Sequence, residues 1–412
     1  MHRAAGLDAA NPLAPFRDRF VITEPGLLYL DGNSLGRLPR TSVDLAAELV
    51  GTQWGDRLIR GWNEGWLELP QRVGDKIGRL LGAVPGEVIV ADSTSVNLFK
   101  LATAAVAARP GRTRIVTDDL NFPSDHHVLA AVAEAAGMKV DVAASTDGIH
   151  GPEDELVGRL GDDVALVSLS ATTYQSGFTY DVAGITAAAH DAGALALWDL
   201  SHAAGSVPIN LADAGADLAV GCTYKYLNGG PGAPAFLYVR SDLHHELDNP
   251  VPGWMGHAAT FSFDPVHRPA PGIRKFLTGT PGVVATALIE PGADLLLEAG
   301  MDTVRDVSLG LTGCLLELFD EHLAPRGFGL GSPRSERRGS HVTVTHQDAL
   351  AVDQALIAAG VVPDFRPPDA IRLGVAPFYV SFVDIALAVE RICEIIDADV
   401  YRGFGDARPQ VT

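Results

Sequence analysis

The sequence predicts an α/β fold in which a mostly parallel sheet is covered by helices on both faces. Two observations predict it. Short apolar runs, typical of buried strands, alternate with longer helical patterns between residues 87 and 239. Nearly every run is followed by a cluster of polar residues, as at the carboxyl ends of parallel strands. The 412 residues, of which 47% are hydrophobic, are enough for a large domain and a smaller companion.

Composition argues against several classes of protein. A formal net charge of −20 repels phosphate backbones, so we expect no nucleic-acid partner. Three cysteines without a CxxC spacing argue against a disulfide framework and a zinc site, and we expect no metal. No stretch resembles a signal peptide or reaches membrane-spanning length without charges, so the expected location is the cytoplasm.

The amino-terminal part contributes a strand, a loop and an aromatic segment. The run Leu27–Leu30 predicts a short strand that leads into the glycine-containing turn Asp31–Gly36. The segment Trp54–Trp66 holds three of the five tryptophans, which indicates core or subunit interface more often than a ligand site. Its aromatic wall would nevertheless suit a flat substrate. An amphipathic helix is predicted over Leu69–Leu81.

The first strand–helix unit of the sheet ends in hydroxyl side chains. Glu87–Ala91 predicts a strand, Asp92–Asn97 a polar turn and Leu98–Ala108 a helix. Hydroxyls and free N–H groups that converge at a helix start can bind an anion, so Thr94 and Ser95 are candidate phosphate ligands. Simple helix capping is the alternative interpretation of these residues.

Two further strands are followed by polar residues of the same kind. Phe122, after the strand Arg114–Thr117, is placed to stack on a planar ring, whereas Ser124 and Asp125 could serve only as helix caps. Ser170 follows the strand Val164–Leu169. The remaining elements predicted here are a helix ending at Ala136, a polar loop Thr172–Tyr180 and a helix Val182–Ala192.

The stretch 194–232 carries the strongest chemical signal. Asp199 closes the strand Ala194–Trp198, and Lys225 follows the strand Leu218–Cys222 at the start of a glycine-rich turn. A pyridoxal phosphate site needs such a pair, a lysine for the Schiff base with the cofactor aldehyde and an acid that keeps the pyridine nitrogen protonated. An ordinary strand-end Asp and a surface Lys are the alternative. Phe236–Val239 predicts the next strand.

The carboxy-terminal part predicts a smaller α+β domain. A boundary is expected near Pro281–Ala287. Arg372 lies among apolar residues of a predicted strand, Ala370–Leu373, which suggests either a bound carboxylate or a salt bridge within the small domain. The other elements predicted are a strand near Val342–Thr345 and helices Ala287–Gly300, Val304–His322, Ala349–Ala359 and Phe382–Ile396.

A family resemblance covers nearly the whole chain. The chain resembles the kynureninase family, in its bacterial form, among the pyridoxal phosphate enzymes of fold type I, the class V aminotransferase-like group. The matching blocks are DGNSLG, IRGWNEGW, ADSTSVNLFKL, NFPSD, WDLSHAAG, GCTYKYLNGGPG, GWMGH, GTPGV and IRLGVAPFY. WDLSHAAG alone is shared with related aminotransferase-like enzymes, but the blocks together are highly specific.

The resemblance implies roles for individual residues. The implied catalytic residues are Lys225, Tyr224 and Asp199. Substrate contacts are implied for Ser34, Trp62 and Arg372, the last as the clamp of the α-carboxylate. Trp62 stands where animal relatives carry a histidine, so the preference for the 3-hydroxylated substrate stays open. The implied pyridoxal 5'-phosphate contacts are Thr94, Ser95, Phe122, Pro123, Ser124, Asp125, Ser170, Asp199, His202, Tyr224 and Lys225, with Trp254 and Thr280 reaching it from the other subunit.

The resemblance also implies the activity and the organisation of the chain. The expected reaction is hydrolytic Cβ–Cγ cleavage of L-kynurenine, or of 3-hydroxykynurenine, to the anthranilate product and L-alanine. The expected assembly is a homodimer with active sites at the subunit interface. The expected large domain carries a seven-stranded sheet over residues 46–285, the small domain covers 286–412, and segment 1–45 joins the small domain and the site. Alternatives are a lyase of the cysteine desulfurase group and a non-catalytic protein of the same fold.

Overall fold

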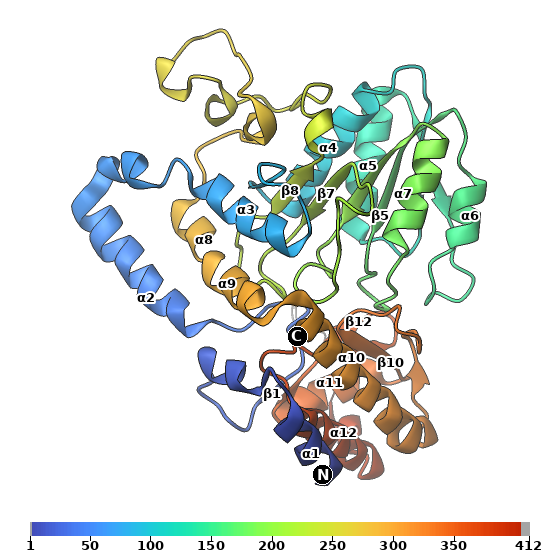
Figure 1. Cartoon of the computed structure of the whole chain (residues 1–412). Helices are drawn as coiled ribbons and strands as arrows, with labels where there is room; N and C mark the ends of the chain where they lie inside the picture. Colours follow the sequence, from blue (N-terminus) through green and yellow to red (C-terminus); the bar gives the residue numbers. More distant parts are fainter. Residues whose placement is uncertain (1, 405–412) are drawn as a thin grey trace.

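The computed structural model describes residues 2–404 and shows two bodies built on separate sheets (Figure 1). A seven-stranded sheet forms the larger body, and a four-stranded sheet forms the smaller one. Amino-terminal residues pack with the smaller body. The division at residues 45/46 and 285/286 stays a prediction. The strands of the large sheet all lie between these two boundaries, and those of the four-stranded sheet all follow the second.

The large sheet is mixed but mostly parallel, as predicted. Its order is β2-β8-β7-β6-β5-β3-β4. β8 runs antiparallel to both of its neighbours, and the other neighbouring strands pair in parallel. β4 forms an edge that the apolar pattern did not reveal, because its residues alternate with Lys139 and Asp141 and are half-exposed. The strands are β2 (Val88–Val90), β3 (Arg114–Asp118), β4 (Lys139–Ala143), β5 (Val164–Ser170), β6 (Leu195–Asp199), β7 (Leu218–Gly221) and β8 (Phe236–Val239).

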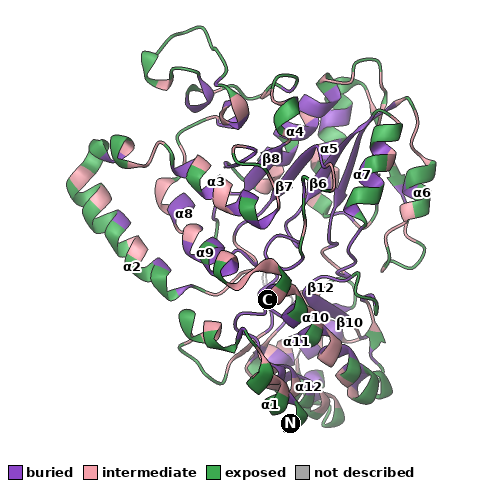
Figure 2. Cartoon of the chain, in the orientation of Figure 1, coloured by how far each residue is buried: buried purple, intermediate pink, exposed green. Residues whose placement is uncertain are grey.

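Helices cover both faces of this sheet (Figures 1 and 2). Leucines of α4 (Thr94–Ala107) and α5 (Pro123–Ala136) bury one face, with alternate strand residues such as Ile115 and Leu197. The opposite face packs against α3 (Leu69–Leu80) and α7 (Val182–Asp191) through residues such as Val116 and Trp198. The predicted polar turn at 92–97 was wrong in part, because Ser93 caps α4 and Thr94 already begins the helix.

The smaller body combines an antiparallel sheet with three helices. Its sheet has the order β12-β13-β10-β9, formed by β9 (Gly329–Leu330), β10 (His341–Thr345), β12 (Asp364–Arg366) and β13 (Ala370–Gly374). Its helices are α10 (Met301–Leu318), α11 (Ala349–Ala358) and α12 (Phe382–Asp397), close to the predicted ranges.

The amino-terminal segment is part of this smaller body. β1 (Leu28–Tyr29) pairs in parallel with β11 (Val361–Val362). The carboxylate of Asp8, in α1 (His2–Ala10), accepts hydrogen bonds from the first backbone N–H groups of α12, those of Phe382 and Val383. An acid at a helix N-terminus satisfies free donors and the helix dipole, so this contact fixes the segment.

An extended arm leads from the amino-terminal segment to the large body, and several short helices lie between the longer elements. The arm comprises α2 (Arg40–Glu48), η2 (Leu49–Arg57) and η3 (Leu58–Glu64), and it stands away from the sheet with a largely exposed surface (Figures 1 and 2). The helix predicted over Ala287–Gly300 is divided into α8 (Val283–Ala287) and α9 (Glu290–Ala299), with Pro291 in the first turn of the second. α6 (Glu153–Gly158) precedes β5, and the other short helices are η1 (Ala14–Arg19), η4 (Ser241–Leu243), η5 (Trp254–Gly256), η6 (Thr260–Ser262), η7 (Gly272–Phe276), η8 (Phe319–Leu323), η9 (Ala324–Arg326) and η10 (Val400–Gly403).

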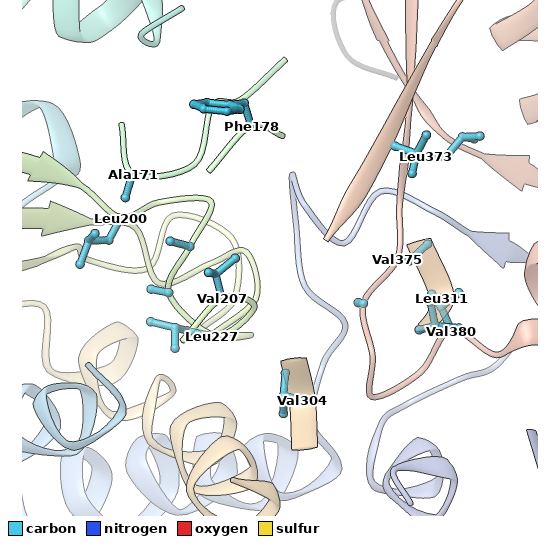
Figure 3. Packing of buried hydrophobic residues seen from close by; sticks show 14 of the residues in the cluster. Ala171, Phe178, Leu200, Val207, Leu227, Val304, Leu311, Leu373, Val375 and Val380 are labelled. Carbon is cyan, nitrogen blue, oxygen red and sulfur yellow. The ribbon is translucent and has the colours of Figure 1, made fainter. Parts of the chain in front are cut away.

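One hydrophobic cluster runs through both bodies. It includes Leu200 and Leu227 beneath the large sheet and Leu311 and Leu373 in the smaller body (Figure 3). Because this core is shared, the relative position of the two bodies is set by packing. Within residues 2–404, no helix is long and apolar enough to cross a bilayer, and no group of metal-ligating side chains is gathered. The three cysteines are free.

Candidate active site

A cavity of about 250 Å³ lies at the carboxyl ends of the large sheet's strands. Parallel α/β sheets bind ligands at this edge because loops and helix N-termini converge there. Most of the predicted site residues meet in this one place. Those lining the cavity are Thr94, Ser95, Phe122, Ser124, Asp125, Ser170, Asp199, His202, Tyr224 and Lys225.

One end of the cavity is suited to an anion. Thr94 and Ser95 occupy the first turn of α4, a helix of 14 residues, after the capping residue Ser93. The Ser95 hydroxyl lies 3.5 Å from that of Ser124, at the start of α5, so two helix N-termini meet here. Their backbone N–H groups and hydroxyls are donors of the kind that bind phosphate.

The same cavity holds two buried carboxyl groups. Asp199 closes β6, Asp125 lies in the first turn of α5, and their side chains are hydrogen-bonded to each other. Burial, and then the charge of the partner acid, raises the pKa of Asp125 well above its usual value, and burial also raises that of Asp199. A cation placed against this pair would favour their ionised forms, as a protonated ring nitrogen does.

Lys225 and His202 lie next to each other in the cavity. The Lys225 Nζ lies 2.8 Å from the Nε2 atom of His202. Burial lowers the pKa of both side chains, because neither charged form is solvated there. The His202 Nδ1 atom is buried and has no hydrogen-bond partner among the described residues. Both shifts favour the uncharged forms, and an uncharged lysine amine is a nucleophile and proton acceptor.

Aromatic side chains form the mouth of the cavity. Phe122 meets Tyr174 edge to face, with ring centroids 5.1 Å apart. Tyr224 precedes Lys225 in the same turn, and the neighbouring Cys222 side chain and then burial raise the pKa of its hydroxyl. Tyr224 therefore keeps its proton at neutral pH and can donate a hydrogen bond.

The Asp31–Gly36 loop joins the lysine turn to the smaller body. The Gly36 N–H donates to the Tyr224 carbonyl at 2.8 Å. A Cβ at Gly36 would collide with the Lys225 carbonyl and the Asn228 side chain, so the close approach requires glycine. Two residues earlier, the Ser34 hydroxyl accepts a hydrogen bond from Arg372 at 3.0 Å. The loop thus touches both the lysine turn and the arginine.

The structure shows one of the two partners that the sequence suggested for the buried Arg372. It pairs with Asp364 across the neighbouring strands β12 and β13, so the salt bridge within the small domain exists. Its Nη1 atom also donates to the Tyr174 carbonyl at 2.6 Å, and Tyr174 lines the cavity. Arg372 is therefore adjacent to the site without lining it.

Some predicted residues lie outside this cavity within the single chain. Pro123 is exposed at the start of α5. Trp62, in η3, packs edge to face on Trp66. Thr280 lines a second cavity of about 260 Å³, which shares Asp92 and Gly232 with the first. Trp254 is half-exposed and packs against Phe261. Trp254 and Thr280 are the two residues expected to act from another subunit.

The structure adds lining residues that sequence reasoning missed. Tyr174 and Ser201 belong to loops after β5 and β6, and Asp92 precedes α4. Asp92 has a φ of 44°, an uncommon conformation for a non-glycine residue, and its carboxylate pairs with the fully buried Lys100. Lys100 also donates to the Phe276 carbonyl at 2.8 Å, so it ties the start of α4 to the segment before Thr280. The other added lining residues are Ser93, Gly232, Ala233 and Ala235.

The donor set fits pyridoxal phosphate. Hydroxyls at two helix N-termini suit its phosphate, and the buried acid pair suits a protonated pyridine nitrogen. A lysine with a lowered pKa lines the same cavity, and the unpartnered His202 Nδ1 can supply a further polar contact. The residues present therefore match the three chemical parts of the cofactor.

Comparison with solved structures defines the class first. A cysteine desulfurase from Thermococcus onnurineus NA1 superposes with a TM-score of 0.81 at 17% identity, covering 93% of this chain and 98% of that one. A mutant of C-DES with glycine covalently linked to its PLP cofactor gives 0.80 at 17% identity, over 92% and 99% of the two chains. The fold is that of the pyridoxal-phosphate-dependent enzymes of fold type I.

Sequence comparison then gives the family. The chain is 41% identical over 397 residues to the kynureninase of Pseudomonas fluorescens, which covers 95% of this chain and 94% of the relative. A kynureninase of Burkholderia pseudomallei strain 1106a is 41% identical over 405 residues, or 97% and 96% of the two chains. Residues 304–392 match the kynureninase C-terminal domain. The chain belongs to the kynureninase family.

Proposed function

We propose that this protein is a pyridoxal-phosphate-dependent kynureninase, which cleaves the Cβ–Cγ bond of L-kynurenine with water to give anthranilate and L-alanine. The observation that carries the proposal is the cavity with Lys225, Asp199 and Asp125, in a chain 41% identical to a curated kynureninase over 95% of its length. It is thus a hydrolase acting on a carbon–carbon bond of a ketone.

The residues of the cavity would hold the cofactor in one orientation. Thr94, Ser95 and the α4 N-terminus would bind its phosphate, and the Asp199 carboxylate would accept a hydrogen bond from its protonated ring nitrogen. Phe122 would stack on its ring, with Ser124, Ser170 and His202 at its edges. When bound, pyridoxal phosphate supplies an aldehyde for an amino group and a ring that withdraws electrons from the α-carbon.

Lys225 and Tyr224 are the proposed proton carriers. The Lys225 amine, whose pKa burial lowers, takes up the α-proton of the substrate. The Tyr224 hydroxyl, which keeps its proton, donates to the leaving part of the substrate and receives a proton back in the later steps. Both side chains come from one turn, so their separation is set by local backbone structure.

Three residues are proposed to bind the substrate. Arg372 binds the α-carboxylate, because its guanidinium lies next to the cavity and can bind a carboxylate with two N–H groups. Ser34 lies on the same guanidinium and contacts the bound substrate from the 31–36 loop. Trp62 is proposed to pack on the aromatic ring of the substrate, which it would reach from a neighbouring subunit.

A homodimer with sites at the subunit interface accounts for the exposed apolar surface. Trp54 and Ile59, on the arm, are 61% and 76% exposed, and Phe263, in the loop after η6, is 78% exposed. A partner that covers large exposed apolar side chains removes their surface from water, which favours association. A second copy of the chain would cover them and bring its Trp254 and Thr280 to the cofactor phosphate. The expected mass in light scattering is that of a dimer, and Phe263→Asp should shift it toward the monomer.

A cysteine desulfurase reaction is the second candidate, because solved neighbours of the fold carry that name. That reaction needs a nucleophilic cysteine on a mobile loop. Cys314 lies in α10, Cys393 lies in α12, and Cys222 is buried behind Lys225, where burial raises the pKa of its thiol. These positions favour kynurenine cleavage over sulfur transfer.

Product formation separates these functions. The holoenzyme should release fluorescent anthranilate from L-kynurenine and no sulfide from L-cysteine. Release of sulfide alone would support the desulfurase reaction, and cofactor absorbance without either product would support a non-catalytic binding protein. The cytoplasmic location expected from the sequence stays a prediction, to be tested by cell fractionation.

A further inference from the structure

The Arg372 guanidinium is held on two different edges by two parts of the molecule. On one edge, Nη2 pairs with the Asp364 carboxylate and donates to the Ser34 hydroxyl at 3.0 Å. On the other, Nη1 donates to the Tyr174 carbonyl at 2.6 Å. The side chain is 1% exposed, so its orientation is set by these contacts.

The Nη1 edge is the one beside the active-site cavity. Tyr174, its partner, lines that cavity. The positive charge of Arg372 also contributes to the lowered pKa of both His202 and Lys225, which places it within electrostatic reach of the reacting amine. Because each terminal nitrogen carries two N–H groups, Nη1 has a second donor for a ligand carboxylate.

The opposite edge is built from strand pairing. Asp364 in β12 and Arg372 in β13 are direct cross-strand partners, so backbone register places the carboxylate next to the guanidinium. Asp364 is 2% exposed and also forms a salt bridge with Arg366, with an N···O distance of 2.9 Å. Nearby, burial and then the charge of Asp364 raise the pKa of Asp31 to about 7, which reduces its negative charge. The Nη1 edge of Arg372 contacts the neutral Tyr174 carbonyl rather than a carboxylate, so this edge can still bind one incoming carboxylate.

We propose that Asp364 is a positioning residue for substrate binding: it fixes the Nη2 edge of Arg372 so that the Nη1 edge is presented to the α-carboxylate of the amino-acid substrate. This inference rests on the proposed function. Asp364 does not touch the substrate and acts through Arg372. Its loss removes the charged partner of the Nη2 edge and leaves only the neutral contacts to Ser34 and Tyr174, so the guanidinium is held less firmly for the incoming carboxylate.

The test compares two ligands that differ only in the carboxylate. L-kynurenine carries it, and kynuramine, the corresponding decarboxylated amine, lacks it. In Asp364→Asn holoenzyme, we expect binding of L-kynurenine to weaken about tenfold or more, the effect of losing a charged hydrogen bond, with kynuramine inhibition changed less than about twofold. The value of kcat should fall much less than KM rises.

A matched control separates positioning from general damage. Asp217→Asn makes the same change at a buried aspartate that pairs with another arginine, Arg240, just before β7, and should leave the ratio of the two affinities at its wild-type value. In an Arg372→Met background, Asp364→Asn should produce no further change in that ratio. Equal weakening of both ligands by Asp364→Asn, or an unchanged ratio, would overturn the proposal.

Two provisions keep the outcome interpretable. If the Asn variant is not recovered folded, Asp364→Glu keeps the charge but displaces the guanidinium, and an unchanged ratio in that variant also overturns the proposal. If the wild-type enzyme releases no anthranilate, the proposed function fails instead. L-alanine and ethylamine, followed by the absorbance of the bound cofactor, then report carboxylate recognition independently of turnover.

Discussion

The Nζ atom of Lys225 lies 2.8 Å from Nε2 of His202, and burial lowers the pKa of both groups. A lysine in water is protonated at neutral pH and cannot act as a nucleophile. Burial in this cavity makes the uncharged amine easier to form than it is in water, and the neighbouring imidazole is its hydrogen-bond partner. The surroundings of this nitrogen therefore favour the role proposed for Lys225 before any ligand arrives.

Replacing this amine should remove both the cofactor linkage and the reaction. Lys225→Ala is expected to lose the visible absorbance band of lysine-linked pyridoxal phosphate and to lose turnover of L-kynurenine, because no other lysine among the described residues lines the cavity. A spectrophotometric titration with the cofactor and an anthranilate fluorescence assay measure the two effects. Retained turnover would remove Lys225 from its central role.

Removal of the guanidinium should affect substrate binding more than cofactor binding. Arg372→Ala is expected to raise KM for L-kynurenine about 100-fold, since a buried bidentate charge pair is lost, while pyridoxal phosphate still binds. Steady-state kinetics and cofactor absorbance provide the two readouts. Loss of the cofactor in this variant would show that Arg372 supports the fold of the site rather than the substrate.

The pair between the buried Lys100 and the exposed Asp92 should contribute to stability. Lys100→Met removes the ammonium that pairs with Asp92 and donates to the Phe276 carbonyl, and losing such charged hydrogen bonds costs about 1.5–3 kcal/mol. Urea unfolding followed by circular dichroism measures this cost. Lys76→Met, at a more exposed pair with Asp294, is the control and should cost less than about 1 kcal/mol. Similar costs for the two variants would contradict the expectation.

Asp353 should make stability depend on pH. Burial, and then the charges of Asp364 and Asp31, raises its pKa from 3.8 to about 7. The native state therefore keeps a proton that the unfolded chain releases, so this group's contribution to stability declines as pH rises from about 4 to about 7. Asp353→Asn lacks this loss, and its gain in Tm over wild type should be larger, by roughly 2 °C, at about pH 8.5 than at about pH 5.5. Differential scanning fluorimetry at both pH values provides the check, and an equal gain would contradict it.

Trp62 should influence the choice between two substrates. An indole packed on the substrate ring favours an unsubstituted aromatic edge over one with a hydroxyl that needs a hydrogen-bond partner. We expect kcat/KM for L-kynurenine to exceed that for 3-hydroxykynurenine about tenfold or more, and Trp62→His to narrow the difference. Equal values for the wild-type enzyme would count against this role.

Much of the sheet and of the cavity could be predicted because both follow from short-range patterns. Six buried strands are continuous apolar runs, and the residues directly after them, such as Asp199 and Ser170, must lie at one edge. The half-exposed edge strand β4 lacks such a run and was missed. Tyr174 was missed because it reaches the cavity through a returning loop, which no periodicity describes.

The partners of Arg372 illustrate what lay beyond sequence reasoning. Its apolar flanks indicated a buried charge, and both the salt bridge and the carboxylate clamp were considered. The structure shows Asp364 as the ion-pair partner because strand register opposes the two residues, and register is a tertiary property. Trp62, Trp254 and Thr280 lie outside the cavity of one chain, so their predicted roles depend on a second copy.

The loop Asp31–Gly36 contacts the Lys225 turn through Gly36 and Arg372 through Ser34. This six-residue loop therefore helps to set the distance between the Lys225 turn and the Arg372 guanidinium, which are proposed to bind the amino group and the carboxylate of the substrate. The amino group and the carboxylate are equally spaced in every α-amino acid. The loop would therefore favour binding of these two groups, and selection between side chains would depend on the residues around the substrate ring. Inserting a single residue between Ser34 and Gly36 would lengthen this loop and should weaken the binding of every α-amino acid to a similar extent.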